Sequence, residues 1–221
     1  LRIPSAVLDA SAAGWMRLKN PGRFLVLIDV SGSMADEVAG TGRTKLQFAQ
    51  DAAIAGVRLV PAAADIGLWE FSTALDGAND YHELVSVGRV GALVGDRTRL
   101  DRLTDAIGGL TPRADTALYD TALAAFRSMR ATYQPGEPNV IILITDGTND
   151  DANSIGLDAL LTAIAAEQDK AAPVRLITLA YGADADTDSL GRIAAASGGT
   201  AFTSPNPADI GTVFFKALNA G

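Results

Sequence analysis

The chain alternates between short, continuously apolar segments and longer segments whose apolar residues recur at helical spacing. Residues 24–28 and 140–144 are the clearest apolar segments, and neither contains a charged or polar residue. Such runs are typical of strands that are buried on both faces in a parallel sheet. Strands alternating with helices predict a mostly parallel sheet covered by helices on both faces. We therefore expect a doubly wound, Rossmann-like α/β fold.

Six strands and six helices can be placed along the chain. The expected strands are 24–30, 66–71, 81–87, 140–144, 174–180 and a short edge strand at 200–203. The expected helices are 44–60, 99–110, 116–132, one capped by Ser154 and extending through Ile164, 186–196 and 207–218. Residues 74–80, between the second and third strands, are too few for a crossover helix. This pair should be antiparallel, which gives the six-stranded sheet one antiparallel edge strand.

Composition and charge limit the partners. The 221 residues carry a net charge of −8, whereas nucleic acids and anionic membrane surfaces require basic patches. We therefore expect no nucleic-acid partner. No apolar run approaches the roughly 20 residues that cross a bilayer, so we expect no direct membrane insertion by this segment. The absence of cysteine excludes disulfides and thiolate metal sites.

The first 22 residues differ from the alternating pattern. Pro4, Pro21 and Gly22 punctuate this stretch. We interpret residues 1–22 as a lead-in or linker and residues 23–221 as the folded domain.

Oxygen-bearing side chains follow two of the expected buried strands. Asp29, Ser31 and Ser33 follow the first strand at alternating positions, and Asp146 follows the fourth. In the common strand order 3-2-1-4-5-6, the first and fourth strands are neighbours at the point where the order reverses, which is where such sheets bind ligands. We therefore expect these oxygens to meet in one crevice, where they suit a hard cation such as Mg²⁺.

Each of these signals has an ordinary structural explanation when it is taken alone. Ser31-Gly-Ser33 could be a strand-to-helix turn, Thr116 a helix N-cap, and Asp146-Gly147 a turn. Their joint occurrence at the ends of the right elements favours a shared site.

In this combination the chain resembles the von Willebrand factor type A domain family. The family's metal-ion-dependent adhesion site has an Asp-x-Ser-x-Ser loop, a distant Thr and a distant Asp. The matching residues here are Asp29, Ser31, Ser33, Thr116 and Asp146. Many members have Gly-Gly before the distant Thr, whereas this chain has Ala114-Asp115, which could narrow the freedom of that loop.

A narrower resemblance points to bacterial, especially actinobacterial, members. It rests on the segments 67–71, 116–120 and 197–200. In many of those proteins the domain follows a substrate-binding-protein-like domain on a secreted or lipid-anchored chain. The resemblance therefore implies an extracellular or cell-envelope location, with any lipid anchor on an N-terminal part of the protein.

The resemblance implies a non-enzymatic module that binds a protein partner. A divalent cation, in first place Mg²⁺ with Mn²⁺ or Ca²⁺ as alternatives, would bind an Asp or Glu carboxylate of the partner. An alternative is a scaffold or assembly role in an envelope substrate-binding or transport complex. A metal-dependent phosphohydrolase with Asp29 as nucleophile is disfavoured, because such sites usually want an acid where Ser31 stands. Ser–His–acid hydrolysis would need His82, the single histidine, which is expected far from the crevice.

Overall fold

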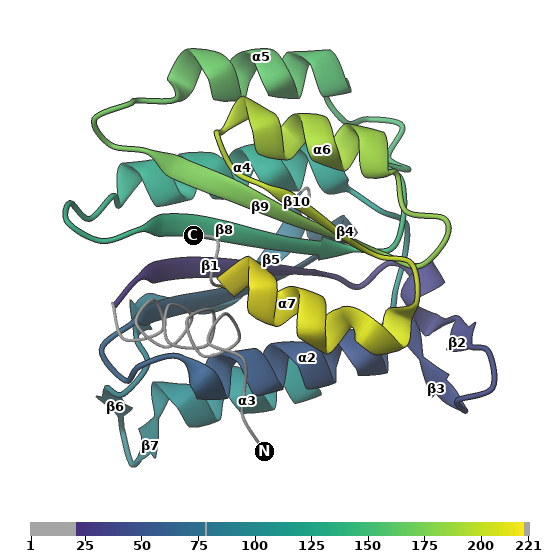
Figure 1. Cartoon of the computed structure of the whole chain (residues 1–221), viewed down its shortest axis with the longest axis horizontal. Helices are drawn as coiled ribbons and strands as arrows, with labels where there is room; N and C mark the ends of the chain where they lie inside the picture. Colours follow the sequence, from purple (N-terminus) through teal and green to yellow (C-terminus); the bar gives the residue numbers. More distant parts are fainter. Residues whose placement is uncertain (1–20, 78, 219–221) are drawn as a thin grey trace, which may run out of the picture.

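A six-stranded sheet lies at the centre of the molecule, with helices packed on both of its faces (Figure 1). The computed structural model describes residues 21–77 and 79–218. The strands of this sheet are β1 (Arg23–Asp29), β4 (Asp65–Asp76), β5 (Asn79–Arg89), β8 (Asn139–Thr145), β9 (Val174–Tyr181) and β10 (Ala201–Ser204). Two short hairpins, β2 (Glu37–Val38) with β3 (Arg43–Thr44) and β6 (Leu93–Val94) with β7 (Arg97–Thr98), lie outside it.

The order of the strands confirms the expected topology. Read from the β5 edge, it runs β5-β4-β1-β8-β9-β10, which is 3-2-1-4-5-6 when these strands are numbered along the chain. All neighbouring strands are parallel except β4 and β5, and the antiparallel β5 lies at one edge. The direction of winding therefore reverses between β1 and β8, as predicted.

The two faces of the sheet are covered by different helices. One face packs against α2 (Lys45–Leu59), α3 (Arg99–Gly108) and α7 (Ile210–Leu218), and the other against α4 (Leu118–Ala131), α5 (Leu157–Glu167) and α6 (Thr187–Ala196) (Figure 1). Side chains on β1 alternate between these two layers: Val26 and Ile28 belong to the first, Leu25 and Leu27 to the second. Each such buried side chain contributes roughly 1.5–3 kcal/mol. This strand is thus fixed from both sides, and so is its carboxyl end.

Two expectations about local structure were wrong. Ser154 does not cap α5, since the N-cap is Gly156 and the Ser154 hydroxyl donates to the carbonyl of Ile155.

The link between β4 and β5 is shorter than residues 74–80, because β4 continues to Asp76 and β5 already begins at Asn79. An irregular register lies within this extension, and Ala74 there adopts a positive φ of 51°. The hairpin thus contains a bulge that hydrophobic patterning does not reveal.

The expected lead-in falls almost entirely on residues 1–20, which lie outside the described residues. Within residues 21–77 and 79–218, no helix combines the length and the apolar character that crossing a membrane requires.

Candidate metal centre

The candidate site lies where β1 and β8 end side by side. Ile28 is in register with Ile144, so Asp29 and Asp146 leave the sheet from adjacent parallel strands. The Thr145 hydroxyl donates to Asp29 Oδ2 at 2.5 Å and joins the two strand ends directly. Both carboxylates are buried. The convergence that topology predicted is therefore present.

The loop after β1 is tightly wound. The backbone N–H of Ser31 donates to Asp29 Oδ1 at 2.8 Å, and a 3-10 turn, η1 (Gly32–Ala35), follows at once. A turn this tight places the hydroxyls of Ser31 and Ser33 on the same side, with their Oγ atoms 3.2 Å apart. The aspartate thus shapes the loop that carries both serines.

A third segment, the loop before α4, brings Thr116 to the site. Two backbone hydrogen bonds hold this loop against the exit of β1: Gly32 N donates to Ala114 O at 2.9 Å, and Arg113 N donates to Val30 O at 2.6 Å. A Cβ atom on Gly147 would lie 3.4 Å from Thr116 Oγ1 and 3.9 Å from Ser33 Oγ. Both hydroxyls therefore face the backbone that follows Asp146. All five predicted site residues come together.

The spacing of the oxygens fits a divalent cation. Ser33 Oγ lies 3.2 Å from Ser31 Oγ and donates to Asp146 Oδ1 at 2.8 Å. Octahedral coordination at about 2.0–2.1 Å places neighbouring ligand oxygens about 2.9 Å apart. Two carboxylates and three neutral hydroxyls are also the hard donors that Mg²⁺, Mn²⁺ and Ca²⁺ accept. The residues present thus suit such an ion in both chemistry and spacing.

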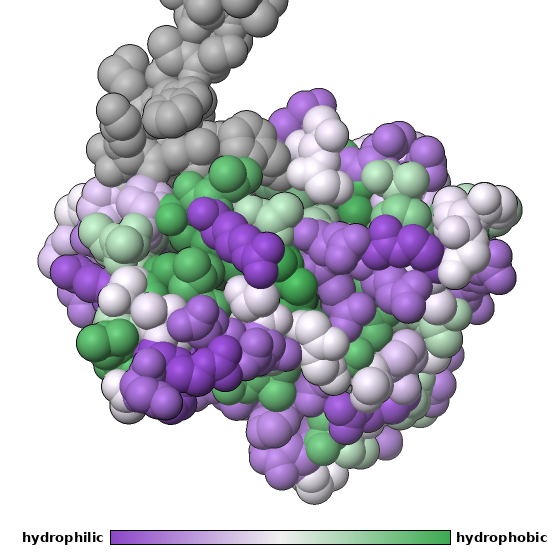
Figure 2. Space-filling model, turned by 90° about the horizontal axis from the view of Figure 1, so that it is seen from below, coloured by the Kyte–Doolittle hydropathy of each residue, from purple (hydrophilic) through white to green (hydrophobic). Residues whose placement is uncertain are grey.

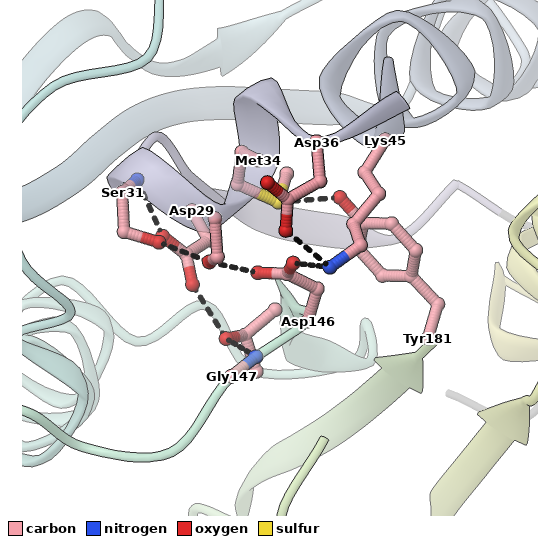
Figure 3. A network of polar contacts seen from close by, with 10 residues as sticks. Asp29, Ser31, Met34, Asp36, Lys45, Asp146, Gly147 and Tyr181 are labelled. Carbon is pink, nitrogen blue, oxygen red and sulfur yellow. Dashed lines mark hydrogen bonds and ion pairs between the residues drawn. The ribbon is translucent and has the colours of Figure 1, made fainter. Parts of the chain in front are cut away.

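The site concentrates negative charge in a buried place. Burial raises the pKa of Asp29 to about 6, although hydrogen bonds from Thr145 and Ser31 act to lower it. Lys45 Nζ donates to Asp146 Oδ2 at 2.7 Å and to Asp36 Oδ2 at 3.2 Å (Figure 3). Among the described residues, Asp146 forms an ion pair with Lys45, whereas Asp29 forms no ion pair.

Three residues at the site were not predicted: Lys45, Thr145 and Asn149. The Asn149 side chain accepts hydrogen bonds from the backbone N–H groups of Leu118 and Tyr119, at 2.9 and 3.1 Å, and so caps α4 from another loop. Thr116 is therefore not the N-cap, which removes its ordinary structural explanation. Thr145 directly precedes Asp146 in the sequence, but nothing in the sequence showed that its hydroxyl would reach Asp29.

The departure from the family pattern before Thr116 has a visible structural effect. Ala114 adopts a positive φ of 50°, a backbone conformation that glycine tolerates far better. Asp115 is exposed, and its backbone N–H and carbonyl bond to the side chains of Thr73 and Ser72 at 3.1 and 2.8 Å. Alanine in this conformation costs about 1 kcal/mol, which glycine would largely avoid.

Other titratable groups near this edge of the sheet have structural partners. His82 is 53% exposed on β5, and its Nδ1 lies 3.5 Å from Glu70 Oε1. Asp80, Asp120 and Asp151 bring carboxylate oxygens within 4.8 Å of one another. Each of these three acids accepts a backbone N–H bond, from Ala74, Ile155 and Asn153 respectively. These acids thus fasten the surrounding loops.

The fold and the site together define a doubly wound α/β domain with carboxylates and hydroxyls gathered where the sheet reverses its winding. The family model described as the von Willebrand factor type A domain matches residues 25–216, and the chain belongs to this family.

Curated relatives include two uncharacterized proteins of Mycobacterium tuberculosis, from strains CDC 1551 / Oshkosh and ATCC 25618 / H37Rv. Each is 29% identical over 145 residues, which cover 65% of this chain and 20% of the relative. The chain therefore spans about a fifth of the length of these relatives.

Solved structures show the same fold. A von Willebrand factor type A protein from Catenulispora acidiphila matches with a TM-score of 0.69 and 21% identity, over 90% of this chain and 42% of that one. Proximal thread matrix protein 1 of the mussel byssus is described with a zinc-occupied metal-ion-dependent adhesion site (MIDAS) motif. It matches with a TM-score of 0.64 and 15% identity, over 91% of this chain and 46% of that one. The pilus adhesin SpaC of Lactobacillus rhamnosus GG matches with a TM-score of 0.64 and 16% identity, over 90% of this chain and 30% of that one.

Proposed function

We propose that the chain is a non-enzymatic, metal-dependent protein-binding module. A divalent cation, in first place Mg²⁺, is held by the five residues Asp29, Ser31, Ser33, Thr116 and Asp146, and a partner protein contributes an Asp or Glu carboxylate. The observation that carries this proposal is the run of oxygens from Ser31 through Ser33 to Asp146, at 3.2 and 2.8 Å. A cation bound there would supply a positive centre to which a carboxylate can bond.

The charges of the chain support the recognition of an acidic ligand that binds only when the metal is present. The protein carries a net charge of −8, so a free carboxylate approaching it is repelled. The two site carboxylates balance a divalent ion, whereas the three hydroxyls of Ser31, Ser33 and Thr116 add no charge. A cation with these donors stays electrophilic, so an acidic partner is recognised only in its presence.

The comparisons are compatible with this proposal. The mussel protein is described with zinc in its MIDAS motif, and SpaC is described as an adhesin. We extend the proposal to an extracellular or cell-envelope location, with residues 1–22 joining the domain at 23–221 to a neighbouring, lipid-anchored part of the protein. The resemblance to bacterial members of the family supports this placement.

Calorimetric titration with Mg²⁺ and Mn²⁺ tests the metal site. Wild type should bind one ion, and Ser31→Ala combined with Ser33→Ala should abolish saturable binding. The matched control is Ser86→Ala combined with Ser154→Ala, which removes two hydroxyls outside the site and should bind like wild type. Unchanged binding in the Ser31 and Ser33 double variant would place any metal elsewhere.

A displayed peptide library tests the partner chemistry. Selection on the wild-type domain in Mg²⁺ should enrich Asp- or Glu-containing peptides that are released by EDTA. Peptides that bind equally well in EDTA, or that carry no acid, would contradict the proposed recognition.

A further inference from the structure

Lys45 occupies an unusual position for a cationic residue. It is the first residue of α2, where the helix dipole disfavours positive charge by several tenths of a kcal/mol or more. The capping box of Thr44 and Gln47 already satisfies this helix end, so Lys45 is not needed to start the helix. The reason for a lysine here lies in what its side chain contacts.

The ammonium group of Lys45 lies between a buried and an exposed carboxylate. The side chain of Asp146 is 0% exposed, that of Asp36 is 64% exposed, and that of Lys45 is 12% exposed. A Cβ atom on Gly182, directly after β9, would lie 3.9 Å from Lys45 Cε, so the aliphatic stem runs along that backbone. Packing and two ion pairs thus hold the ammonium beside the candidate site.

The carboxylate of Asp146 divides its two oxygens between different partners. Oδ1 accepts the Ser33 hydroxyl on the side of the candidate metal ligands, whereas Oδ2 accepts from Lys45. Lys45 therefore does not need to leave for a cation to reach Oδ1. Its positive charge instead remains a few ångströms from any cation held there.

Without a metal, Lys45 compensates the buried negative charge of the site. Asp29 and Asp146 are both buried, and buried charges are strongly destabilising unless they are paired. Lys45 supplies the cation in the described structure. A group that stabilises the metal-free form more than the metal-bound form weakens metal binding. The free energy of binding becomes less favourable by the difference between the two stabilisations.

We propose that Lys45 is a resident counter-cation that holds the metal affinity of this site down. This inference rests on the proposed metal site, and in it Lys45 sets the affinity of that site for its ion. A unit charge about 5 Å from a divalent ion weakens the binding of that ion by about tenfold even with the dielectric constant of water. The site consequently binds its ion weakly enough that a partner's carboxylate can contribute a large share of the final affinity.

Metal titration of Lys45→Met, by calorimetry at fixed ionic strength, tests the proposal. The variant should bind Mg²⁺ or Mn²⁺ at least about tenfold more tightly than wild type. Lys45→Arg retains the charge and should stay within about threefold of wild type. Lys170→Met removes an exposed lysine elsewhere, changes the net charge equally, and should have no effect on affinity. If Lys45→Met does not fold, Lys45→Gln removes the charge and keeps a donor to Asp146.

Thermal unfolding supplies a second readout that does not require metal binding. In EDTA, Lys45→Met should unfold at a lower temperature than wild type, and saturating metal should close this gap. Equal melting temperatures in EDTA would contradict the compensating role.

The outcomes separate this inference from the proposed function. If wild type binds metal and Lys45→Met binds it equally or more weakly, only the role of Lys45 is overturned, since the lysine then merely orients Asp146. If neither protein binds metal, the metal site and the role of Lys45 both fall. Binding by Lys45→Met alone would support the role of Lys45 and show that the wild-type site is too weak to act without a partner.

Discussion

Thr145 at the end of β8 donates its hydroxyl to Asp29 at the end of β1, with 2.5 Å between Oγ1 and Oδ2. The same hydroxyl accepts the backbone N–H of Gly147 at 3.2 Å. One side chain thus connects the first acid of the site to the backbone that carries the second. The two strand ends act as one unit, and a change in Thr145 should be felt at both carboxylates.

Thr145→Val tests this connection with a side chain of nearly the same shape. The variant leaves Asp29 Oδ2 and the Gly147 N–H without a buried partner, so we expect a loss of about 1–3 kcal/mol in the free energy of unfolding. Metal affinity should fall as well, because Asp29 loses its orientation. Urea unfolding in EDTA and calorimetric titration measure the two effects.

Thr178→Val is the matched control for this prediction. Thr178 is also buried, and its hydroxyl donates to Leu190 O at 3.0 Å, on β9 rather than at the site. This variant should lose comparable stability while its metal affinity stays unchanged. A fall in affinity of the same size in both variants would show that lost stability, and not the Thr145–Asp29 bond, controls metal binding.

The pKa of Asp29 predicts how the stability of the metal-free protein depends on pH. Burial raises this pKa from 3.8 to about 6, so the folded form binds a proton more tightly than the unfolded form does. Stability in EDTA should therefore decrease as pH rises from about 4 to about 6, by about 3 kcal/mol from this group. Urea unfolding across this range, for wild type and Asp29→Asn, isolates the effect.

Asp29→Asn keeps one acceptor oxygen for the backbone N–H of Ser31 and places an NH2 group beside the Thr145 hydroxyl, but it cannot ionise, so the decrease should be absent from it. The acids whose pKa is lowered, such as Asp186 and Glu167, add stability as pH rises and do so equally in both proteins. The same pH dependence in wild type and Asp29→Asn would assign the decrease to another group.

Asn149→Ala tests the cap that α4 receives from the loop after β8. The substitution removes the acceptor for two N–H groups at the start of the helix and should cost about 1 kcal/mol. Because Thr116 lies two residues before this helix, metal affinity should fall too. Asn206→Ala removes an acceptor for Ala208 N far along the chain and should lower stability alone. Denaturant unfolding measures the stability of both variants, and calorimetric titration measures their metal affinity. Unaltered metal affinity in Asn149→Ala would show that the cap of α4 does not influence the metal site.

Much of the fold could be predicted because its signals are local. Fully apolar runs identified the buried strands, and the short link between β4 and β5 required an antiparallel pair. The strand order itself was taken from the common arrangement of such sheets, and the observed order matches it and brings Asp29 and Asp146 together. The start of α5 was predicted wrongly, because Ser154 resembles a cap in sequence but its hydroxyl bonds to Ile155 O instead.

The residues that surround the candidate ligands could not be predicted in the same way. Lys45 reaches Asp146 across 101 positions, and Asn149 reaches the start of α4 across about 30. Such contacts depend on side-chain directions in loops, where no periodicity applies. A lysine at a helix start contradicts the helix dipole, and this local conflict was the one sign in the sequence that Lys45 has a partner elsewhere.

Gly147→Ala tests whether the space between the hydroxyls of Thr116 and Ser33 is needed for metal. The added methyl would lie 3.4 Å from Thr116 Oγ1, an ordinary contact, so the protein should fold with a stability close to that of wild type. The same methyl narrows the space in front of both hydroxyls, and we expect metal affinity to fall by about tenfold or more, as changes beside metal ligands typically do. Gly191→Ala, in α6, meets no heavy atom within 4 Å of its added Cβ and is the matched control. Calorimetry should separate the two variants, whereas equal affinities would mean that Thr116 and Ser33 do not approach one ion from the side of Gly147.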